Sequence, residues 1–355
     1  MNADAAIALP REVSEITAHW MTEAFRSQGR DIAVSRIELE DHIAGASSKV
    51  RVRLETANAD DPKRVIVKGG FEKHSREMKG MHWAEARAYR DLIPRVPASA
   101  PRSWYAEVDA EGQGIVVMED LTLRDVRFLS LQTPIGFDTA CRFLESLAAL
   151  HASMWGAPDL VDGALFGDVA MPMVGRFEAY IERLTEPANF AAYAERPRGA
   201  AIPVALHDRE RMKAGLWALR DSYAGQTRTI VHGDTHLGNL YLDADGNPGF
   251  LDWVIRRAPW QNEINYFITA ALDLPDRRRW EGALLEHYLA ALRGHGIDAP
   301  DFDTAWLLYR REVVWGFFIW FLNSWDFQTE SRNTAAATRF AMAMIDHDTY
   351  GLLGV

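Results

Sequence analysis

The sequence contains very little cysteine: Cys141 is the single one in 355 residues. One cysteine can form neither an intramolecular disulfide nor a cysteine-rich metal site. Stable disulfides belong to oxidising compartments, so a reducing compartment is the simplest expectation. Residues 1–15 also lack the basic region followed by an apolar region that marks a secretory signal. Together these absences predict a cytoplasmic protein.

Long apolar runs are missing as well. The longest one covers residues 313–322, and a helix that crosses a bilayer needs about 20 apolar residues. We therefore expect this run to lie in a buried helix, and we expect no membrane partner. Glycine and proline, at 25 and 15 residues, are near average, which excludes collagen-like and low-complexity chains.

Basic residues are outnumbered by acidic ones, 39 to 50, for a net charge of −11. This balance argues against a nucleic-acid partner, because sequence-independent binding to nucleic acids needs a basic surface. The acidic excess suits a cationic substrate, or it simply keeps the protein soluble. Apolar residues make up 48% of the chain, enough for a sizeable core, and the length predicts two domains or two lobes.

The apolar pattern changes character along the chain. A helix with Ser14 as its cap is predicted at 14–27, strands at 37–43, 50–55, 65–68 and 114–119, and a helix at 75–92. From Phe137 onward the pattern is helical, except for strands around an Asp-Gly turn within 227–253. We therefore expect an α+β fold with a small β-rich N-terminal lobe (1–117), a hinge (118–122) and a larger α-helical C-terminal lobe (123–355).

The segment 231–253 gathers the most informative residues. Asp234 and Asn239 are five residues apart, the spacing of the catalytic Asp and the metal-binding Asn in the kinase loop H-R-D-x-x-x-x-N. Asp252 ends the strand after the turn, where a hairpin returns it beside Asn239. The oxygens of Asn239 and Asp252 suit Mg²⁺. This pattern predicts Asp234 as the base for an acceptor hydroxyl, with Mg²⁺ held against a triphosphate.

A second candidate pair lies upstream. Lys68 ends the apolar strand V-I-V-K, much as the ATP-site lysine ends V-A-I-K. Glu85 interrupts the apolar stripe of the helix predicted at 75–92, and a buried carboxylate is costly unless it is paired. Lys68 is the natural partner. Such a Lys–Glu ion pair positions the α- and β-phosphates of ATP in kinases.

A glycine-rich phosphate loop is absent. The turn between the first two strands offers Gly45, Ser47 and Ser48 instead, small residues that allow the backbone to approach a phosphate. An ordinary hairpin turn explains the same residues.

Two other functions remain open at this point. His232, Asp234 and His236 offer two imidazoles and a carboxylate, a possible Zn²⁺ set for a metal-dependent hydrolase, although the histidines can equally brace the loop through hydrogen bonds. A nucleotide-binding protein of the same fold without catalytic activity is the other alternative. A G-x-S-x-G motif does not occur, so a serine hydrolase has no support.

Across roughly residues 14–350 the chain resembles the aminoglycoside phosphotransferase and choline kinase-like family, and within it the bacterial relatives of ecdysteroid kinase-like proteins. The segments that carry the resemblance are HGDTHLGN (232–239), FLDW (250–253), VIVK (65–68), EARAYRDL (85–92), VVMEDL (116–121) and LAALHASMW (147–155). The resemblance implies a two-lobed protein-kinase-like fold and ATP-dependent phosphorylation of a small-molecule alcohol by a monomer or homodimer.

The resemblance also implies roles for individual residues. Asp234 becomes the catalytic base, Asn239 and Asp252 the Mg²⁺ ligands, and Lys68 with Glu85 the phosphate-positioning pair. Met118, Glu119 and Leu121 form the hinge, where backbone groups of Glu119 and Leu121 meet adenine. One departure concerns Glu263, which stands near the place of a family Asp and is expected to brace the catalytic loop.

The acceptor is less clearly indicated. The C-terminal residues 351–355 carry no acidic side chain, whereas a polycationic antibiotic needs clustered carboxylates. The late helices are instead rich in aromatic residues: Trp306, Tyr309, Trp315, Phe317, Phe318, Trp320, Phe321, Trp325 and Phe327. Most of them are expected to fill the core, with Trp315 and Trp325 as candidates to hold a hydrophobic alcohol or a quaternary ammonium.

Overall fold

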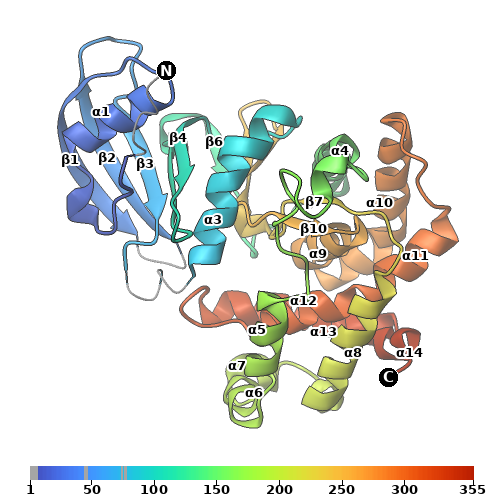
Figure 1. The fold of residues 1–355 in the computed structure, drawn as a ribbon. Coiled ribbons are helices and arrows are strands. Elements are labelled where there is room, and N and C mark those ends of the chain that lie inside the picture. The colour runs from blue at the N-terminus through green and yellow to red at the C-terminus, as the bar shows by residue number, and fades with distance from the viewer. Residues whose placement is uncertain (1–6, 44–46, 73–74, 76–77) are drawn as a thin grey trace. The chain divides into compact units, whose positions relative to one another are not determined.

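The computed structural model describes residues 7–43, 47–72, 75 and 78–355. The chain forms two compact units (Figure 1). The first unit ends at Val126 but also takes in Leu251–Val254, and the second consists of Arg127–Phe250 and Ile255–Val355. Asp252 therefore belongs to the first unit, although the hairpin that precedes it belongs to the second.

A five-stranded antiparallel sheet is the centre of the first unit, with strand order β1-β2-β3-β5-β4. Its strands are β1 (Val34–Ile43), β2 (Ser48–Thr56), β3 (Arg64–Gly69), β4 (Ser103–Val108) and β5 (Gly114–Glu119). The four strands predicted from the sequence are all present. The strand β4 was not predicted, because prolines at 97 and 101 precede it and mask its apolar pattern.

One face of this sheet packs against the N-terminal helix α1 (Ala18–Ser27), which follows the short turn η1 (Val13–Glu15). Trp20, Met21 and Phe25 of α1 share an apolar core with Val50 and Val52 and with further residues of the inner strands. The cap is Thr17, whose side chain accepts from the backbone N–H of Trp20. The predicted cap, Ser14, was therefore wrong: that residue lies inside η1.

The helix α3 (Lys79–Arg87) also packs on the sheet and continues as a π-helical turn, η2 (Ala88–Leu92), and then η3 (Ile93–Arg95). A close approach between α3 and β5 requires glycine at position 114. A Cβ atom there would lie 2.1 Å from the carbonyl oxygen of His82. This contact brings Glu85 of α3 close to the inner strands.

The second unit is mostly helical. Its helices are α4 (Phe137–Ser153), α5 (Arg176–Leu184), α6 (Pro187–Ala194), α7 (Pro197–Ala200), α8 (Arg209–Ser222), α9 (Gln261–Ala271), α10 (Leu274–Gly294), α11 (Phe302–Arg311), α12 (Val313–Phe321), α13 (Glu330–Asp346) and α14 (Thr349–Leu353). Short 3₁₀ turns of this unit lie at η5 (Pro158–Leu160), η6 (Val204–Leu206) and η7 (Leu237–Asn239), whereas η4 (Leu121–Leu123) belongs to the first unit.

Two small sheets complete the fold. The strands β8 (Leu240–Asp243) and β9 (Pro248–Phe250) form the predicted hairpin, and β6 (Val126–Phe128) pairs with β8. Gly246 in the turn has a φ of +77°, which explains the Asp-Gly pair at this position. A two-stranded sheet joins β7 (Thr229–Val231) to β10 (Arg256–Ala258).

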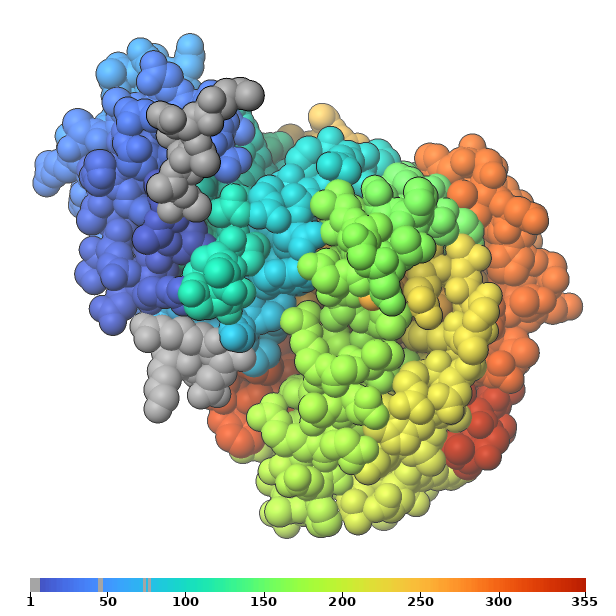
Figure 2. All heavy atoms as spheres, in the orientation of Figure 1, coloured from blue at the N-terminus to red at the C-terminus, as the bar shows by residue number. Residues whose placement is uncertain are grey.

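The helix α9 lies at the centre of the second unit, and every one of its residues is buried. The apolar run predicted to form a buried helix is α12, whose residues join the same core as those of α8 and α13. Residues of α5, α6 and α8 share this core with α12, and in Figure 2 the segment α5–α8, green to yellow, is on the near face of the second unit. None of the helices in the described ranges is long and apolar enough to cross a bilayer.

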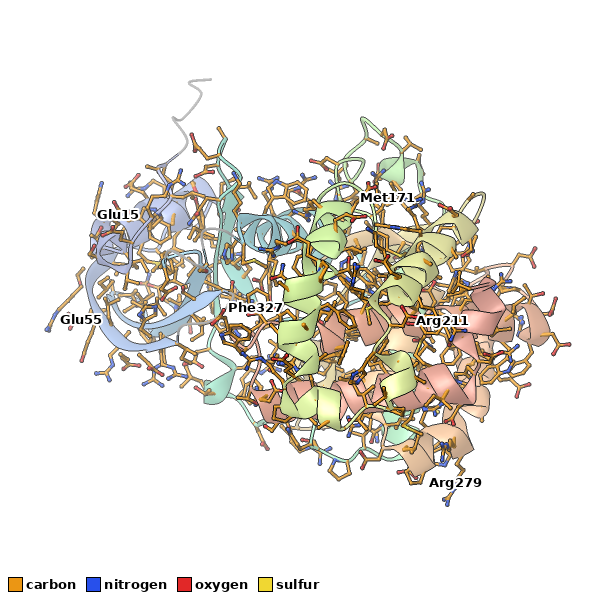
Figure 3. The ribbon with its side chains drawn as sticks, turned by 90° about the horizontal axis from the view of Figure 1, so that it is seen from below. Glu15, Glu55, Met171, Arg211, Arg279 and Phe327 are labelled. Carbon is orange, nitrogen blue, oxygen red and sulfur yellow. The ribbon has the colours of Figure 1, made fainter. Side chains whose placement is uncertain are left out.

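The C-terminal segment is fastened to α8. The guanidinium of Arg211 lies 4.6 Å from the ring centroid of Tyr350 and donates to the carbonyl oxygen of Val355 at 3.0 Å (Figure 3).

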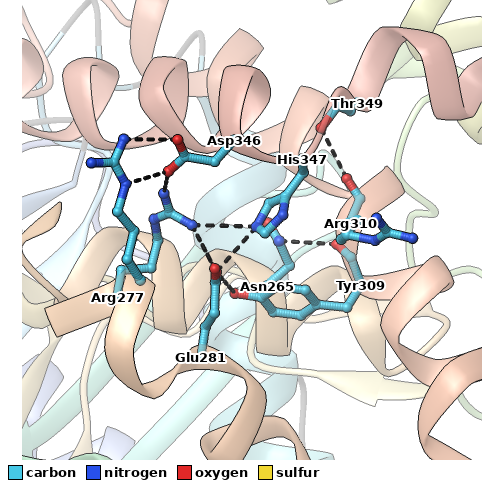
Figure 4. A network of polar contacts seen from close by, with 9 residues as sticks. Asn265, Arg277, Glu281, Tyr309, Arg310, Asp346, His347 and Thr349 are labelled. Atoms are coloured by element: carbon cyan, nitrogen blue, oxygen red, sulfur yellow. Dashed lines mark hydrogen bonds and ion pairs between the residues drawn. The ribbon is translucent and has the colours of Figure 1, made fainter. Parts of the chain in front are cut away.

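A buried polar network ties α10 to α11 and α13 (Figure 4). Arg277 donates to both carboxylate oxygens of Glu281, at 2.9 and 2.8 Å, and forms an ion pair with Asp346. His347 and Tyr309 also contact Glu281, at 3.1 and 3.4 Å. Because Arg277 is fully buried, its charge depends on these two carboxylates.

We predict that Arg277→Met lowers the free energy of unfolding by about 3–5 kcal/mol, because it leaves the buried carboxylate of Glu281 without its cation. Urea denaturation measures this as a lower midpoint at an unchanged slope. Arg279→Met is the matched control, since Arg279 is exposed on the same helix (Figure 3) and its loss should cost less than about 0.5 kcal/mol. Equal losses in the two variants would contradict the role assigned to the network.

Candidate active site

A buried ion pair in the first unit joins β3 to α3. Lys68 donates from Nζ to Oε1 of Glu85 at 2.6 Å, and both side chains are almost completely buried. Each charge stabilises the other, because a buried charge without a partner is costly. The contact expected from the sequence is therefore present.

Asp252 shares this ion pair. Its Oδ1 accepts from Nζ of Lys68 at 2.7 Å, and its Oδ2 accepts from Nζ of Lys49, on β2, at 3.0 Å. The backbone φ of Asp252 is +55°, in the left-handed region that non-glycine residues rarely adopt. Such strained residues cluster at functional sites.

The charges in this cluster shift each other's pKa. Burial alone would raise the pKa of the Asp252 carboxyl, but Lys49 and Lys68 hold that pKa far below its ordinary value. Burial works against the charged form of Lys68, yet Asp252 and Glu85 raise the pKa of Lys68 overall. Burial raises the pKa of Glu85 despite the attraction of Lys68. Asp252 is therefore ionised, and Lys68 is a cation.

The predicted hinge residues follow one another at the end of β5. Met118 is buried and accepts from the hydroxyl of Tyr89 at 3.7 Å. The backbone N–H of Glu119 donates to the carbonyl oxygen of Arg102 at 2.8 Å, so that N–H group is not available to a base. The N–H of Leu121 has no acceptor among the residues that the structure describes. Of the two backbone groups expected to meet adenine, the N–H of Leu121 is therefore the one that lacks an acceptor in the described ranges.

The predicted phosphate-loop residues are placed differently from one another. Gly45 lies outside the described residues. The hydroxyl of Ser47 contacts Nδ1 of His82 at 3.0 Å. The side chain of Ser48 is fully buried and, by the alternation of the strand, faces the same way as Val50, opposite to Lys49. This position does not favour the Ser48 hydroxyl as a phosphate ligand.

In the second unit, Glu263 of α9 holds the segment that contains Asp234. Its two carboxylate oxygens accept from the backbone N–H groups of His232, at 2.9 Å, and Gly233, at 2.7 Å. His151 of α4 contacts the same carboxylate at 2.9 Å. Gly233 has a φ of +91°, a conformation that favours glycine, and it turns both N–H groups toward Glu263. The expected brace is confirmed by these contacts.

Burial works against the charged form of Glu263, but the hydrogen bond and charge of His151, with His232 and the N–H of Gly233, lower the pKa of Glu263. Glu263 is therefore a carboxylate in a fully buried position.

Asp234 accepts hydrogen bonds from two side chains, and Nε2 of His236 lies 3.6 Å from its Oδ2. Tyr266, one turn along α9 from Glu263, donates from its hydroxyl to Oδ1 at 2.8 Å. Asn239 donates from Nδ2 to Oδ2 and to the backbone carbonyl of Asp234, both at 2.9 Å. Its other amide atom, Oδ1, is left for another partner, such as a metal ion. The carboxylate of Asp234 is thus fixed in direction on a loop that is itself fixed.

The two loop histidines are engaged in local hydrogen bonds. Nδ1 of His232 accepts from the N–H of Asp234 at 3.2 Å, and Nδ1 of His236 accepts from the N–H of Gly238 at 3.0 Å. Within the described ranges no group of three or more His, Cys, Asp or Glu side chains is arranged to hold a metal ion. The bracing role fits these two residues better than a zinc site does.

The late aromatic residues mainly fill the core, as expected. Trp315 is fully buried, whereas Trp325 is half exposed and lies under the guanidinium of Arg196, 3.9 Å from the ring centroid. Gly233, Arg256, Asn262, Glu263, Tyr266 and Trp315 surround a gap beside the loop of Asp234 that is too small to admit a water molecule. Arg256 is buried there, 5.5 Å from the ring centroid of Trp315, and its Nε atom has no hydrogen-bond partner among the described residues.

Three residues of the site were missed in the sequence. Lys49 alternates with the apolar residues of its strand, and only the register of β2 on β3 reveals that it lies opposite Lys68. Tyr266 lies three residues after Glu263, which places both on one face of a helix. His151 lies within a segment that carries the family resemblance, but its contact with Glu263 spans 112 residues.

Comparisons with known proteins agree with this geometry. The model of the phosphotransferase enzyme family matches residues 42–296. A search of curated proteins finds none that matches.

Among solved structures, the chain is similar to ethanolamine kinase from Plasmodium vivax, with 11% identity, a TM-score of 0.53 and coverage of 88% of this chain and 83% of that one. It is also similar to LicA in complex with AMP, with 16% identity, a TM-score of 0.50 and coverage of 94% and 99%. It is similar as well to macrolide 2′-phosphotransferase MphH from Brachybacterium faecium, with 15% identity, a TM-score of 0.48 and coverage of 90% of this chain and 97% of that one. The first two confirm the expected α+β, protein-kinase-like fold.

We predict a pH dependence of stability that comes from Glu312, which follows α11. Burial raises the pKa of Glu312 to about 8 from its ordinary value of 4.5, although Tyr223 and Asn262 donate hydrogen bonds to it. Between these values the folded chain keeps the proton and the unfolded chain releases it. The free energy of unfolding should therefore fall as the pH rises through this window, by up to about 1.4 kcal/mol for each pH unit.

Urea denaturation at several pH values between 5 and 8 tests this prediction. Glu312→Gln should abolish this part of the slope, because glutamine does not titrate. The exposed Glu286→Gln should leave the slope as in the parent chain. Parallel profiles for the parent chain and Glu312→Gln would show that Glu312 is ionised in the folded chain.

Proposed function

The chain belongs to the phosphotransferase enzyme family, and from this premise we propose that it transfers the γ-phosphate of ATP to a hydroxyl group of a small molecule. The observation that carries the proposal is the arrangement around Asp234, whose carboxylate is held by Tyr266 and Asn239 on a loop braced by Glu263. Phosphoryl transfer needs mainly an oriented nucleophile and neutralised phosphate charge. A fixed carboxylate at the loop meets the first need.

In this proposal Asp234 accepts the proton of the acceptor hydroxyl. Lys68, oriented by its contact with Glu85, binds phosphate oxygens. Met118, Glu119 and Leu121 form the segment that binds adenine, and the N–H of Leu121 has no acceptor among the described residues. The resemblance to LicA in complex with AMP is consistent with a nucleotide ligand.

Asn239 and Asp252 are the residues proposed to bind Mg²⁺. Each offers an oxygen atom, the ligand type that Mg²⁺ prefers, and Asp252 is ionised. When bound there, Mg²⁺ would supply positive charge that neutralises the phosphate oxygens.

The proposed acceptor is an alcohol that is not a polycation. Arg256 is buried beside the loop of Asp234, with its guanidinium over the rings of Phe177 and Trp315. Its positive charge would repel the ammonium groups of a polycation and attract an anionic group. The single cysteine further supports a cytoplasmic location.

A transfer assay tests the proposal. The protein is incubated with Mg²⁺, γ-labelled ATP and a panel of aminoglycosides, amino alcohols, sugars, sterols and other hydrophobic alcohols. We expect a labelled product from an uncharged or anionic alcohol. Tight binding of Mg²⁺·ATP with no transfer to any acceptor would favour the non-catalytic alternative, and an aminoglycoside product would overturn the acceptor class.

We predict that Asp234→Asn reduces transfer by a factor of about 10² to 10⁴, the usual contribution of a general base, and leaves the affinity for Mg²⁺·ATP unchanged. Calorimetry measures the affinity, and the labelled product measures the transfer. Asp245→Asn in the exposed hairpin turn is the matched control and should retain full activity. If Asp234→Asn loses nucleotide affinity together with transfer, the assignment of Asp234 as the base is wrong.

A further inference from the structure

Lys49 and Lys68 are direct cross-strand partners in the register of β2 and β3. Residues directly opposite each other in an antiparallel pair project from the same face of the sheet, and like charges in such a pair destabilise it. Asp252 relieves this repulsion by giving one oxygen to each lysine, at 3.0 Å for Lys49 and 2.7 Å for Lys68. The two ammonium groups thus share one carboxylate.

Lys49 differs from the other basic residues of β2 in how few carboxylates it contacts. Lys49, Arg51 and Arg53 alternate along the strand and so lie on the same face. Arg51 has ion pairs with Asp41 and Asp120, and Arg53 has ion pairs with Glu38 and Glu40. Lys49 has one carboxylate partner within the described ranges, Asp252, and it shares that partner with Lys68.

The exposure of the two lysines also differs. The side chain of Lys68 is 4% exposed, and its second partner, Glu85, holds it in place. The side chain of Lys49 is 37% exposed, and that of Asp252 is 33% exposed. An anion from solvent can therefore reach Lys49 and the shared carboxylate, whereas Glu85 remains covered.

We propose that Lys49 is a second phosphate-binding lysine, which acts with Lys68 on the phosphate oxygens of a nucleoside di- or triphosphate. This inference rests on the proposed function and extends it. Two cations on adjacent strands match a ligand with several anionic oxygens, since charge-assisted hydrogen bonds are the strongest kind. In the free protein the Asp252 carboxylate takes the place of a phosphate and keeps the two lysines together.

The test compares adenosine, AMP and ADP as ligands of Lys49→Gln, measured by calorimetry in EDTA so that no metal contributes. We expect the affinity for ADP to fall by about tenfold or more, as for the loss of one charged hydrogen bond. The affinity for adenosine should stay unchanged, because adenosine has no phosphate. Lys49→Arg, which keeps the charge, should retain most of the affinity for ADP.

Lys63→Gln is the matched control. Lys63 is an exposed lysine at the other end of the same β2–β3 hairpin and donates to backbone carbonyls rather than to a carboxylate. Its removal changes the net charge by the same amount and should leave the affinity for ADP within about twofold, because distant exposed charges are screened.

A second measurement uses Asp252→Asn. Without metal this change frees both lysines from the carboxylate, so the affinity for ADP should rise. That rise should shrink when Asp252→Asn is made in the Lys49→Gln background, because loss of the carboxylate then frees Lys68 alone. A rise of equal size in both backgrounds would mean that Lys49 does not take part.

Three outcomes overturn the inference about Lys49 alone. They are an unchanged affinity for ADP in Lys49→Gln, a tighter binding of ADP, and equal losses for adenosine and ADP, which would reflect local unfolding. In each case the parent chain still binds ADP, so the proposed function stands. If the parent chain binds neither ADP nor Mg²⁺·ATP, the proposed function and this inference fall together.

Discussion

The conformation of the loop that carries Asp234 depends on the carboxylate of Glu263. A buried carboxylate is costly unless it accepts several hydrogen bonds, and Glu263 accepts from two consecutive backbone N–H groups and from His151. This requirement works in both directions. The buried charge of Glu263 needs hydrogen bonds from the N–H groups of His232 and Gly233. In turn, the left-handed conformation of Gly233 lets both N–H groups point at this carboxylate. A protonated or uncharged residue in place of Glu263 would satisfy neither requirement.

The helix α9 carries this constraint to the rest of the second unit. All of its residues are buried, and four of its polar side chains have partners outside the helix. Glu263 and Tyr266 contact the loop of Asp234, Asn262 contacts Glu312, and Asn265 contacts the carbonyl of Tyr309. A helix that is polar in part and wholly buried cannot slide without breaking several of these bonds. The rigidity of the Asp234 carboxylate therefore comes from the core rather than from the loop itself.

Much of this arrangement could be predicted from the sequence, and the rest depended on tertiary contacts. Alternation and apolar runs predicted the strands 65–68 and 114–119, because buried strands and helices leave a periodic pattern. Glu85 lies on the apolar stripe of its helix, and a buried charge needs a partner of opposite sign. This allowed its contact with Lys68 to be predicted. Lys49 and His151 left no such signal. The role of Lys49 depends on strand register, and that of His151 depends on a contact with a residue far along the chain.

In the first unit, charges of opposite sign also stabilise one another, in the cluster of Lys49, Lys68, Glu85 and Asp252, but part of this cluster is exposed to solvent. Asp252 adopts a left-handed backbone conformation that costs on the order of 1–3 kcal/mol, and Lys49 and Lys68 offset this cost by pairing with its ionised carboxylate. Two of the four charged groups are partly exposed, whereas the Glu263 carboxylate is completely covered. Glu263 is therefore bound permanently to its partners, while the partners of Asp252 are open to exchange. An ion pair whose members face solvent, and which holds a strained residue, is suited to being replaced by a more highly charged ligand, and this is the property that a phosphate site requires.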